Sequence, residues 1–341
     1  MTVRVAVLAD TSLQRHLLQQ ALSAPGYSIA LNSDPQQVKV EEIATYQVDV
    51  WLVNLLQTDD EKCQVLEHLY ETDTPVLFGE GQAPERHSED YPRWERSLLS
   101  KIDQLLQTKA GSINTQASHA DSASQERLSL PESLAKLTSS IGKPAREVWL
   151  LAASLGGPSA VKEFLDVLPS GLPVGFIYAQ HIDASFEEKL PQAVGRHSEW
   201  RVRLAQHCEA VYSGEVVVVP VQNELNFTET GTINILDNPW TGAYSPSIDQ
   251  VMLNLTQRFA QRSGVIVFSG MGEDGSRASA YAKKQGAIIW VQSAESCACP
   301  SMPDSIRKTG HSSYSSTPRG LAMAMLNHLI QRYTANSMRI S

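Results

Sequence analysis

The sequence predicts an α/β fold with parallel sheets, and two observations carry this prediction. Short apolar segments of strand length alternate along most of the chain with amphipathic segments of helical periodicity. One polar, Ser- and Ala-rich stretch interrupts the alternation and is typical of a flexible linker. The 341 residues are enough for two domains with a core each. We therefore expect α/β domains over 1–109 and 141–337, joined by a flexible linker over 110–140.

The first predicted domain alternates strands and helices over its whole length. Its first helix is expected to stop before Pro25-Gly26, because both residues end helices. In chain order we expect strands at Val3–Leu8, Val48–Leu55 and Val76–Phe78, and helices at Leu13–Leu22, Cys63–Tyr70 and Trp94–Leu106.

The second predicted domain repeats the alternation more strongly. We expect strands at Val148–Ala153, Val174–Ala179, Val216–Pro220, Val265–Ser269 and Ile288–Val291, and helices at Ser159–Val167, Phe186–Val194, Ile248–Arg258, Ser276–Lys284 and Pro318–Tyr333. A threonine-rich hairpin over Asn226–Leu236 interrupts the series. This pattern predicts a doubly wound, mostly parallel sheet with helices on both faces.

Composition excludes several classes of function. The net charge is −9, and residues 1–110 carry 17 acidic against 9 basic residues, so a nucleic-acid partner is not expected. The N-terminus meets an aspartate before a signal core could form. The apolar runs fall far below the ~20 residues that span a bilayer. Four sparse cysteines suggest neither a disulfide scaffold nor a zinc site. We expect a cytoplasmic protein without a metal and without membrane insertion.

Polar groups follow three of the predicted strands directly. Ser154 lies in a glycine-rich turn over 153–158, His181 comes just after the next strand, and Asp274 belongs to the glycine-rich segment Ser269–Gly275. In an open parallel sheet, reactive groups belong at the carboxyl ends of the strands. Each residue also has a structural interpretation, since Ser154 and Asp274 could cap helices and His181 could be an ordinary histidine.

Together the three residues are the parts of a hydrolytic triad. A histidine takes the proton of a serine, and a carboxylate fixes the tautomer of the imidazole. The glycines in the two loops allow backbone N–H groups to point at an oxyanion; they are Gly156, Gly157, Gly270 and Gly272. The order Ser…His…Asp and the absence of G-x-S-x-G distinguish the pattern from that of α/β-hydrolases. The spacing thus predicts a hydrolase.

Five ordered motifs over some 180 residues resemble those of bacterial chemotaxis methylesterases, the CheB family. They are SLGGP at Ser154, a strand ending in Gln180-His181, PSID over Pro246–Asp249, SGMGEDG over Ser269–Gly275, and Met302-Pro303. The resemblance implies hydrolysis of glutamate γ-methyl esters on chemoreceptors, and in some members deamidation of glutamines. It implies Ser154 as nucleophile, His181 as general base and Asp274 as its orienting carboxylate. It also implies the Met271 N–H in the oxyanion hole and no cofactor.

The resemblance extends to the front domain, which in this family is a phosphorylation-controlled receiver with a flavodoxin-like fold. Val5–Arg15 resembles a receiver opening, and the strand ending at Asn54 resembles the one that presents the phosphoacceptor. An amide cannot form the acyl phosphate that a carboxylate forms. Ala9 stands where an acidic Mg²⁺ ligand is usual, and Gly79 where a Thr or Ser is usual. We therefore expect a degenerate receiver that is not switched by phosphorylation at Asn54.

Three departures from the family pattern lie in the second domain. Leu155 and Ser269 stand where threonine is common, and Ser301 where glycine is common. None removes a triad member, so we expect an active esterase. Its expected partner is the cytoplasmic helical bundle of methyl-accepting chemotaxis receptors, with other chemosensory proteins as further partners and type IV pilus systems as one setting. The alternative is a catalytically weak binding module in which Leu155 has spoiled the site. A DNA-binding regulator is disfavoured by the acidic front half.

Overall fold

The chain folds into two α/β units. The computed structural model describes residues 2–23, 26–55, 65, 68–69, 72, 74–78, 83–112, 127–135, 141–196 and 198–337. Packing divides the chain into Met1–Ala117 with Ile182–Lys189, and Ser118–His181 with Leu190–Ser341. The domain limits at 109/110 and 140/141 stay a prediction. Most of the predicted helix over 63–70 and most of the linker lie outside the described residues, as does Gly79.

The first unit contains a four-stranded parallel sheet in the order β2-β1-β3-β4. Its elements are β1 (Val3–Ala9), α1 (Ser12–Ala21), β2 (Tyr27–Ser33), α2 (Val40–Ile43), β3 (Val50–Asn54), β4 (Val76–Phe78) and α4 (Tyr91–Ser112). Helix α1 begins at Ser12 because the Thr11 hydroxyl accepts the Gln14 N–H at 3.2 Å. The order 2-1-3-4 is that of flavodoxin-like sheets, so the expected receiver-like fold is confirmed.

The second unit contains a seven-stranded parallel sheet in the order β13-β12-β11-β5-β6-β8-β7. Its elements are α5 (Glu132–Ala135), β5 (Glu147–Ala153), α6 (Gly157–Val167), β6 (Val174–Gln180), α7 (Leu190–Gly195), β7 (Arg201–Leu204), β8 (Glu215–Val218), β9 (Leu225–Phe227), β10 (Ile233–Ile235), α8 (Ile248–Phe259), β11 (Ser263–Val267), α9 (Ser276–Lys284), β12 (Ile288–Gln292), α10 (Ser301–Thr309), β13 (Tyr314–Ser316) and α11 (Pro318–Ser337). Strands β9 and β10 form the predicted antiparallel hairpin.

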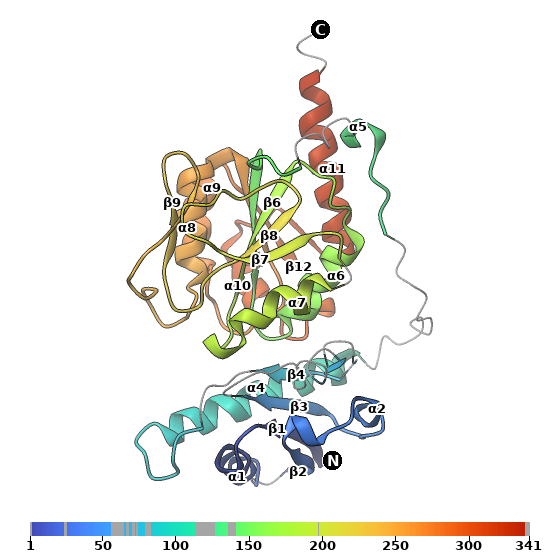
Figure 1. Cartoon of the computed structure of the whole chain (residues 1–341), viewed down its shortest axis with the longest axis vertical. Coiled ribbons are helices and arrows are strands. Elements are labelled where there is room, and N and C mark those ends of the chain that lie inside the picture. The colour runs from blue at the N-terminus through green and yellow to red at the C-terminus, as the bar shows by residue number, and fades with distance from the viewer. Residues whose placement is uncertain are drawn as a thin grey trace. The chain divides into compact units, whose positions relative to one another are not determined.

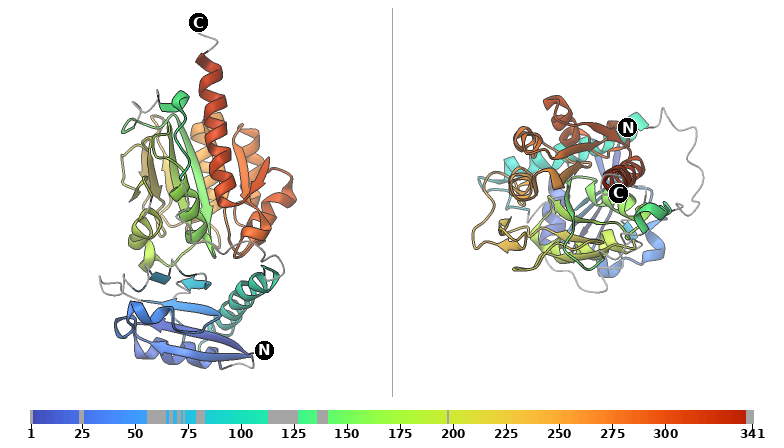
Figure 2. Two further views of the ribbon diagram at one scale, coloured as in Figure 1. Left: turned by 90° about the vertical axis from the view of Figure 1, so that its right-hand side faces the viewer. Right: turned by 90° about the horizontal axis from the view of Figure 1, so that it is seen from above.

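Helices cover both faces of this sheet (Figure 1). Along β5, Val148 and Leu150 point into a cluster shared with α8 and α9. On the opposite face, Phe164 of α6 packs edge-on against Phe176 of β6, with ring centroids 5.7 Å apart. Figure 2 shows α11 as a long helix that extends past the end of the sheet. This layered arrangement confirms the predicted doubly wound α/β fold.

Proline accounts for the clearest difference from the predicted helices. The segment expected as one helix over Phe186–Val194 is a 3₁₀ helix over Ala184–Lys189 followed by α7. Pro191 lies in the first turn of α7, where a missing N–H is tolerated, and it would break a helix that ran through it. Within the described residues, no helix combines the length and the apolar character that crossing a bilayer requires.

Candidate active site

The candidate site lies where the winding of the second sheet reverses. Strand β5 has β6 on one side and β11 on the other, and the chain visits these two neighbours in opposite directions from β5. Ligands of open parallel sheets bind at such switch points, beyond the carboxyl ends of the strands. Ser154 follows β5, His181 follows β6, and Asp274 lies in the loop after β11. The sheet thus brings the three predicted residues to one edge.

Ser154 and His181 leave adjacent strands side by side. Ala153 pairs with Gln180 in the parallel register, and the His181 N–H donates to the Ala153 carbonyl at 3.0 Å. Gln180 is 4% exposed, and its Nε2 donates to the carbonyls of Ser154 (2.8 Å) and His181 (3.0 Å). The Tyr178 hydroxyl in turn donates to Gln180 Oε1 at 2.7 Å. A buried amide therefore holds the backbone of both residues, a role that the sequence motif alone did not reveal.

Asp274 anchors the imidazole of His181. A 2.9 Å hydrogen bond joins His181 Nε2 to Asp274 Oδ2. Asp274 also accepts the backbone N–H groups of Ile248 (2.7 Å) and Asp249 (2.9 Å) at the start of α8. Burial raises the pKa of Asp274, but the hydrogen bond and charge of His181 and the two backbone N–H groups outweigh it and lower that pKa below its ordinary value. The lowered pKa favours the ionised carboxylate, which holds the His181 imidazole through this hydrogen bond.

Tyr244 covers His181, and sequence reasoning missed it. The two rings are stacked, with centroids 4.8 Å apart and planes 5° from parallel. The Tyr244 hydroxyl lies 2.9 Å from where a Cβ on Gly272 would be, so the tyrosine spans from the histidine to the glycine-rich loop. Its side chain belongs to an exposed loop just before PSID, and only that position in the sequence could have drawn attention to it.

The predicted glycines permit close approach around Ser154. A Cβ on Gly270 would lie 2.9 Å from Ser154 Cβ and 2.6 Å from Met302 Cε, so only glycine lets this loop lie against the serine. Gly156 has a φ of +73° and precedes α6, and a Cβ on Gly157 would lie 2.5 Å from Ala153 Cβ. The turn at Ser154 and the loop after β11 therefore lie in close contact, and the Ser154 N–H donates to the Ser269 carbonyl at 3.0 Å.

The hydroxyl of Ser269 joins three segments of the site. It is fully buried, donates to the Leu155 carbonyl at 2.7 Å and accepts the Cys299 N–H at 2.9 Å. Replacement of the common threonine by serine keeps this connection. The Leu155 side chain is 9% exposed and belongs to the buried apolar residues.

The described part of the chain holds no group of three or more His, Cys, Asp or Glu side chains arranged for a metal. Cys208 is exposed, whereas Cys297 and Cys299 are buried free thiols. Burial raises the pKa of the Cys297 thiol to about 12. Cys63 lies outside the described residues.

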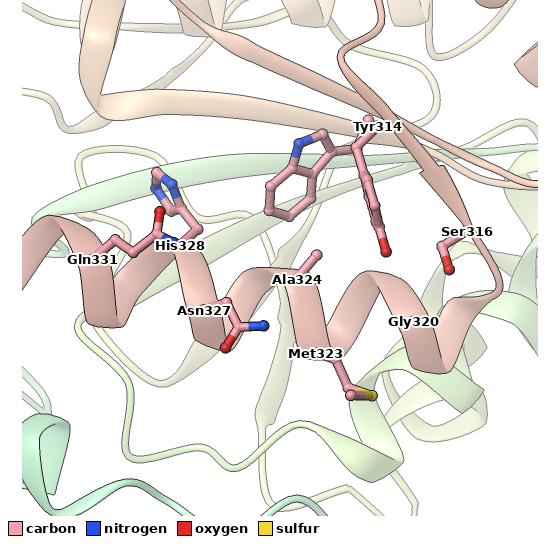
Figure 3. Close-up of a pocket in the computed structure, with 9 residues that line it drawn as sticks. Tyr314, Ser316, Gly320, Met323, Ala324, Asn327, His328 and Gln331 are labelled. Atoms are coloured by element: carbon pink, nitrogen blue, oxygen red, sulfur yellow. The ribbon is translucent and has the colours of Figure 1, made fainter.

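A cavity of about 560 Å³ lies between α11 and strands β12 and β13 (Figure 3). Its lining includes Trp290, Tyr314, Met323 and His328, but none of the three triad candidates. His328 also forms a 3.0 Å hydrogen bond with the buried Glu147 of β5. The cavity is therefore a feature separate from the candidate active site.

In the first unit, Asn54 lies at the end of β3, opposite Ala9 of β1 in the parallel register. Asn54 is 2% exposed. The two residues that differ from the usual receiver residues thus lie side by side at the carboxyl ends of neighbouring strands.

The sequence of this chain is similar to those of known proteins. The family model for CheB methylesterase matches residues 149–325. A protein-glutamate methylesterase/protein-glutamine glutaminase 1 of Saccharophagus degradans is 37% identical over 161 residues, 47% of this chain and 44% of that protein. A protein of the same name from Oleidesulfovibrio alaskensis is 26% identical over 347 residues, 90% of this chain and 94% of that protein.

The fold is similar to that of a solved structure. The crystal structure of the Thermotoga maritima CheB methylesterase catalytic domain matches with a TM-score of 0.52 and 20% identity, covering 54% of this chain and 98% of that one. The chain spans less than half the length of the S. degradans relative but nearly all of the O. alaskensis one. Since the family model matches more than half of its residues, the chain belongs to the CheB methylesterase family.

Proposed function

We propose that this protein hydrolyses glutamate γ-methyl esters with Ser154 as nucleophile, His181 as general base and Asp274 as the carboxylate that orients it. The observation that carries the proposal is the 2.9 Å hydrogen bond between His181 and Asp274, next to the strand end that bears Ser154, in a CheB-family chain. The names of the relatives extend the proposal to deamidation of glutamine side chains.

Acylation begins when the Ser154 hydroxyl attacks the ester carbonyl carbon. Because His181 Nε2 is bound to Asp274, Nδ1 is the nitrogen that takes the serine proton. The carbonyl electrons move to oxygen and form a tetrahedral oxyanion. His181 then returns the proton to the methoxy oxygen, methanol leaves, and the glutamyl group stays as an ester of Ser154.

Deacylation reverses these roles with water as the nucleophile. His181 takes a proton from water, whose oxygen attacks the acyl carbon, and the same proton passes to Ser154 Oγ as the ester bond breaks. The product is a glutamate carboxylate. For a glutamine side chain the first leaving group is ammonia, and the second step is unchanged.

The Met271 N–H is the proposed donor to the oxyanion. The N–H groups of Ser154, Gly270 and Gly272 all donate to other oxygen atoms of the protein. Among the residues that the structure describes, the Met271 N–H has no such acceptor. One oxyanion donor contributes roughly 3–4 kcal/mol to the transition state. No metal or organic cofactor enters these steps.

The proposed substrate is the cytoplasmic helical bundle of a methyl-accepting chemotaxis receptor. The names of the relatives support a glutamate or glutamine side chain of a protein as the group acted on, and membership of the CheB family supports a chemosensory protein as its carrier. Contacts with other chemosensory proteins, a cytoplasmic location and a type IV pilus setting remain predictions from the sequence.

Methanol release from a methylated receptor fragment tests the proposal. We expect S154A to lower the rate by at least about 10³-fold. Ser159→Ala is the matched control, because this serine lies exposed on α6. Equal rates for wild type and S154A would exclude Ser154 as nucleophile, and an inactive wild type would favour the binding-module alternative.

A further inference from the structure

One hydroxyl contacts both residues that flank Met271. Ser301 is the first residue of α10, and its Oγ accepts the Gly272 N–H at 3.0 Å and donates to the Gly270 carbonyl at 3.2 Å. Two backbone hydrogen bonds of 2.9 Å also join Gly270 to the segment at the start of α10. Ser301 thus connects the loop after β11 to α10 on both sides of Met271.

We propose that Ser301 is a positioning residue for the oxyanion hole, an inference that rests on the proposed function. The Gly270 carbonyl and the Met271 N–H belong to one planar trans peptide and point in opposite directions. Holding the carbonyl on α10 therefore aims the N–H away from α10. Gly270 lies against Ser154 Cβ, so this peptide borders the nucleophile.

The second contact of Ser301 fixes the next peptide plane. The Gly272 N–H shares its peptide with the Met271 carbonyl, and Gly272 has a φ of +99°. Glycine has little steric preference of its own, so a hydrogen bond is needed to hold one orientation. By accepting this N–H, Ser301 fixes the direction of the second peptide beside Met271.

Both hydrogen bonds depend on the hydroxyl of Ser301. Glycine, which the family pattern has before Met302-Pro303, has no hydroxyl and cannot make either contact. A role limited to the stability of α10 would predict a lower melting temperature without a selective effect on turnover. A role in positioning predicts a loss of transition-state stabilisation, and therefore a lower kcat, without a change in substrate binding.

Steady-state methanol release from S301A and S301G distinguishes these roles. We expect kcat to fall about tenfold with KM unchanged within about twofold, because a displaced donor affects the transition state and not substrate binding. Ser305→Ala is the control, since Ser305 lies on the same helix and donates to the Met302 carbonyl at 2.7 Å. An unchanged kcat in S301A, or a loss that is entirely in KM, would overturn the proposal.

Deuterium exchange provides a readout that does not depend on the substrate. In S301A we expect the Gly272 amide to exchange at least about fivefold faster than in wild type or S305A, as loss of one hydrogen bond implies. If the wild type released no methanol, the proposed function would fail, and this exchange alone would decide whether Ser301 holds the loop. An unchanged rate of deuterium exchange at the Gly272 amide would show that Ser301 does not hold this peptide, and would overturn the proposal.

Discussion

Tyr244 lies in a surface loop, is 39% exposed and is stacked on His181. Its ring limits the orientations of the imidazole and keeps water from one of its faces. Aromatic stacking of this kind contributes about 0.5–1.5 kcal/mol. The contact therefore helps to orient His181, the proposed general base.

We expect Tyr244→Ala to lower kcat/KM for methanol release by about two- to thirteenfold, the factor that this stacking energy gives. Tyr244→Phe keeps the ring and should retain most of the activity. Equal kcat/KM for Y244A and wild type would show that stacking does not position His181.

At the residue scale, the sequence predicted the proposed triad residues, two of which the structure joins by a hydrogen bond, but not the neighbouring residues that contact them. Ser154 and His181 were predicted because they come just after strands, and Asp274 because it lies in the glycine-rich loop after a strand. The contacts of Tyr244 and Ser301 were not predicted, because they depend on how segments distant in the sequence fold onto the site. Local spacing carries no information about such contacts.

At the scale of elements, the N-termini of α8 and α9 are each capped by a carboxylate that belongs to the other helix or to the loop before it. Asp274, two residues before α9, accepts two N–H groups of α8, and Asp249 of α8 accepts the Ala278 N–H of α9 at 2.8 Å. Unpaired N–H groups and the helix dipole both favour an anion at a helix N-terminus. These reciprocal hydrogen bonds give the PSID motif a structural role in fixing Asp274.

Asp249→Ala should destabilise the protein by about 1–2 kcal/mol, because it leaves the Ala278 N–H without its acceptor. Urea unfolding followed by circular dichroism measures the change. Asp249→Asn keeps an acceptor oxygen and should lose less. Equal stability of D249A and wild type would show that the hydrogen bond from the Ala278 N–H to Asp249 does not stabilise α9.

The charge of Asp274 also predicts a pH dependence of stability. Its folded-state pKa is lowered, so its contribution is fully present above the ordinary value of 3.8 and is lost as the pH falls through the folded value. Asp274→Asn should be less stable than wild type by about 1–2 kcal/mol at pH 7. The difference should shrink below pH 3.8. A difference independent of pH would show that the ionised carboxylate is not what stabilises α8.

Among the elements of the second unit, helices with strong periodicity were predictable and the two edge strands of the sheet were not. Helix α9 has the predicted limits. Strand β7 reads Arg-Val-Arg-Leu and β13 has three residues without a buried side chain, so neither has the apolar signal of a central strand. Their pairing is decided by tertiary contacts at the two ends of the sheet.

At the scale of the whole molecule, the first unit has a receiver-like sheet, and we predict from Asn54 that it is not phosphorylated at the usual position. Asn54 and Ala9 lie opposite each other at the end of β3 and β1. The fold could be predicted because alternation and burial specify it, whereas the order of strands required the resemblance to a known family. The proposed site residues were predicted from the same resemblance together with their positions after strands.

Incubation with a small phosphodonor should leave this protein without an acid-stable, base-labile phosphate, because Asn54 cannot form an acyl phosphate. Mass spectrometry of the intact protein measures the product. A receiver with an intact aspartate serves as the positive control. Phosphate found on Asp10 would contradict the expectation.

If His181 and Asp274 activate Ser154 as proposed, a fluorophosphonate should modify this serine selectively. Intact mass and peptide mapping should show one adduct per chain, on Ser154, in the wild type. Ser154→Ala should give no adduct, and His181→Gln should slow the reaction by at least about 10²-fold. A wild type that stays unmodified, or a His181→Gln variant that reacts at the wild-type rate, would contradict this account.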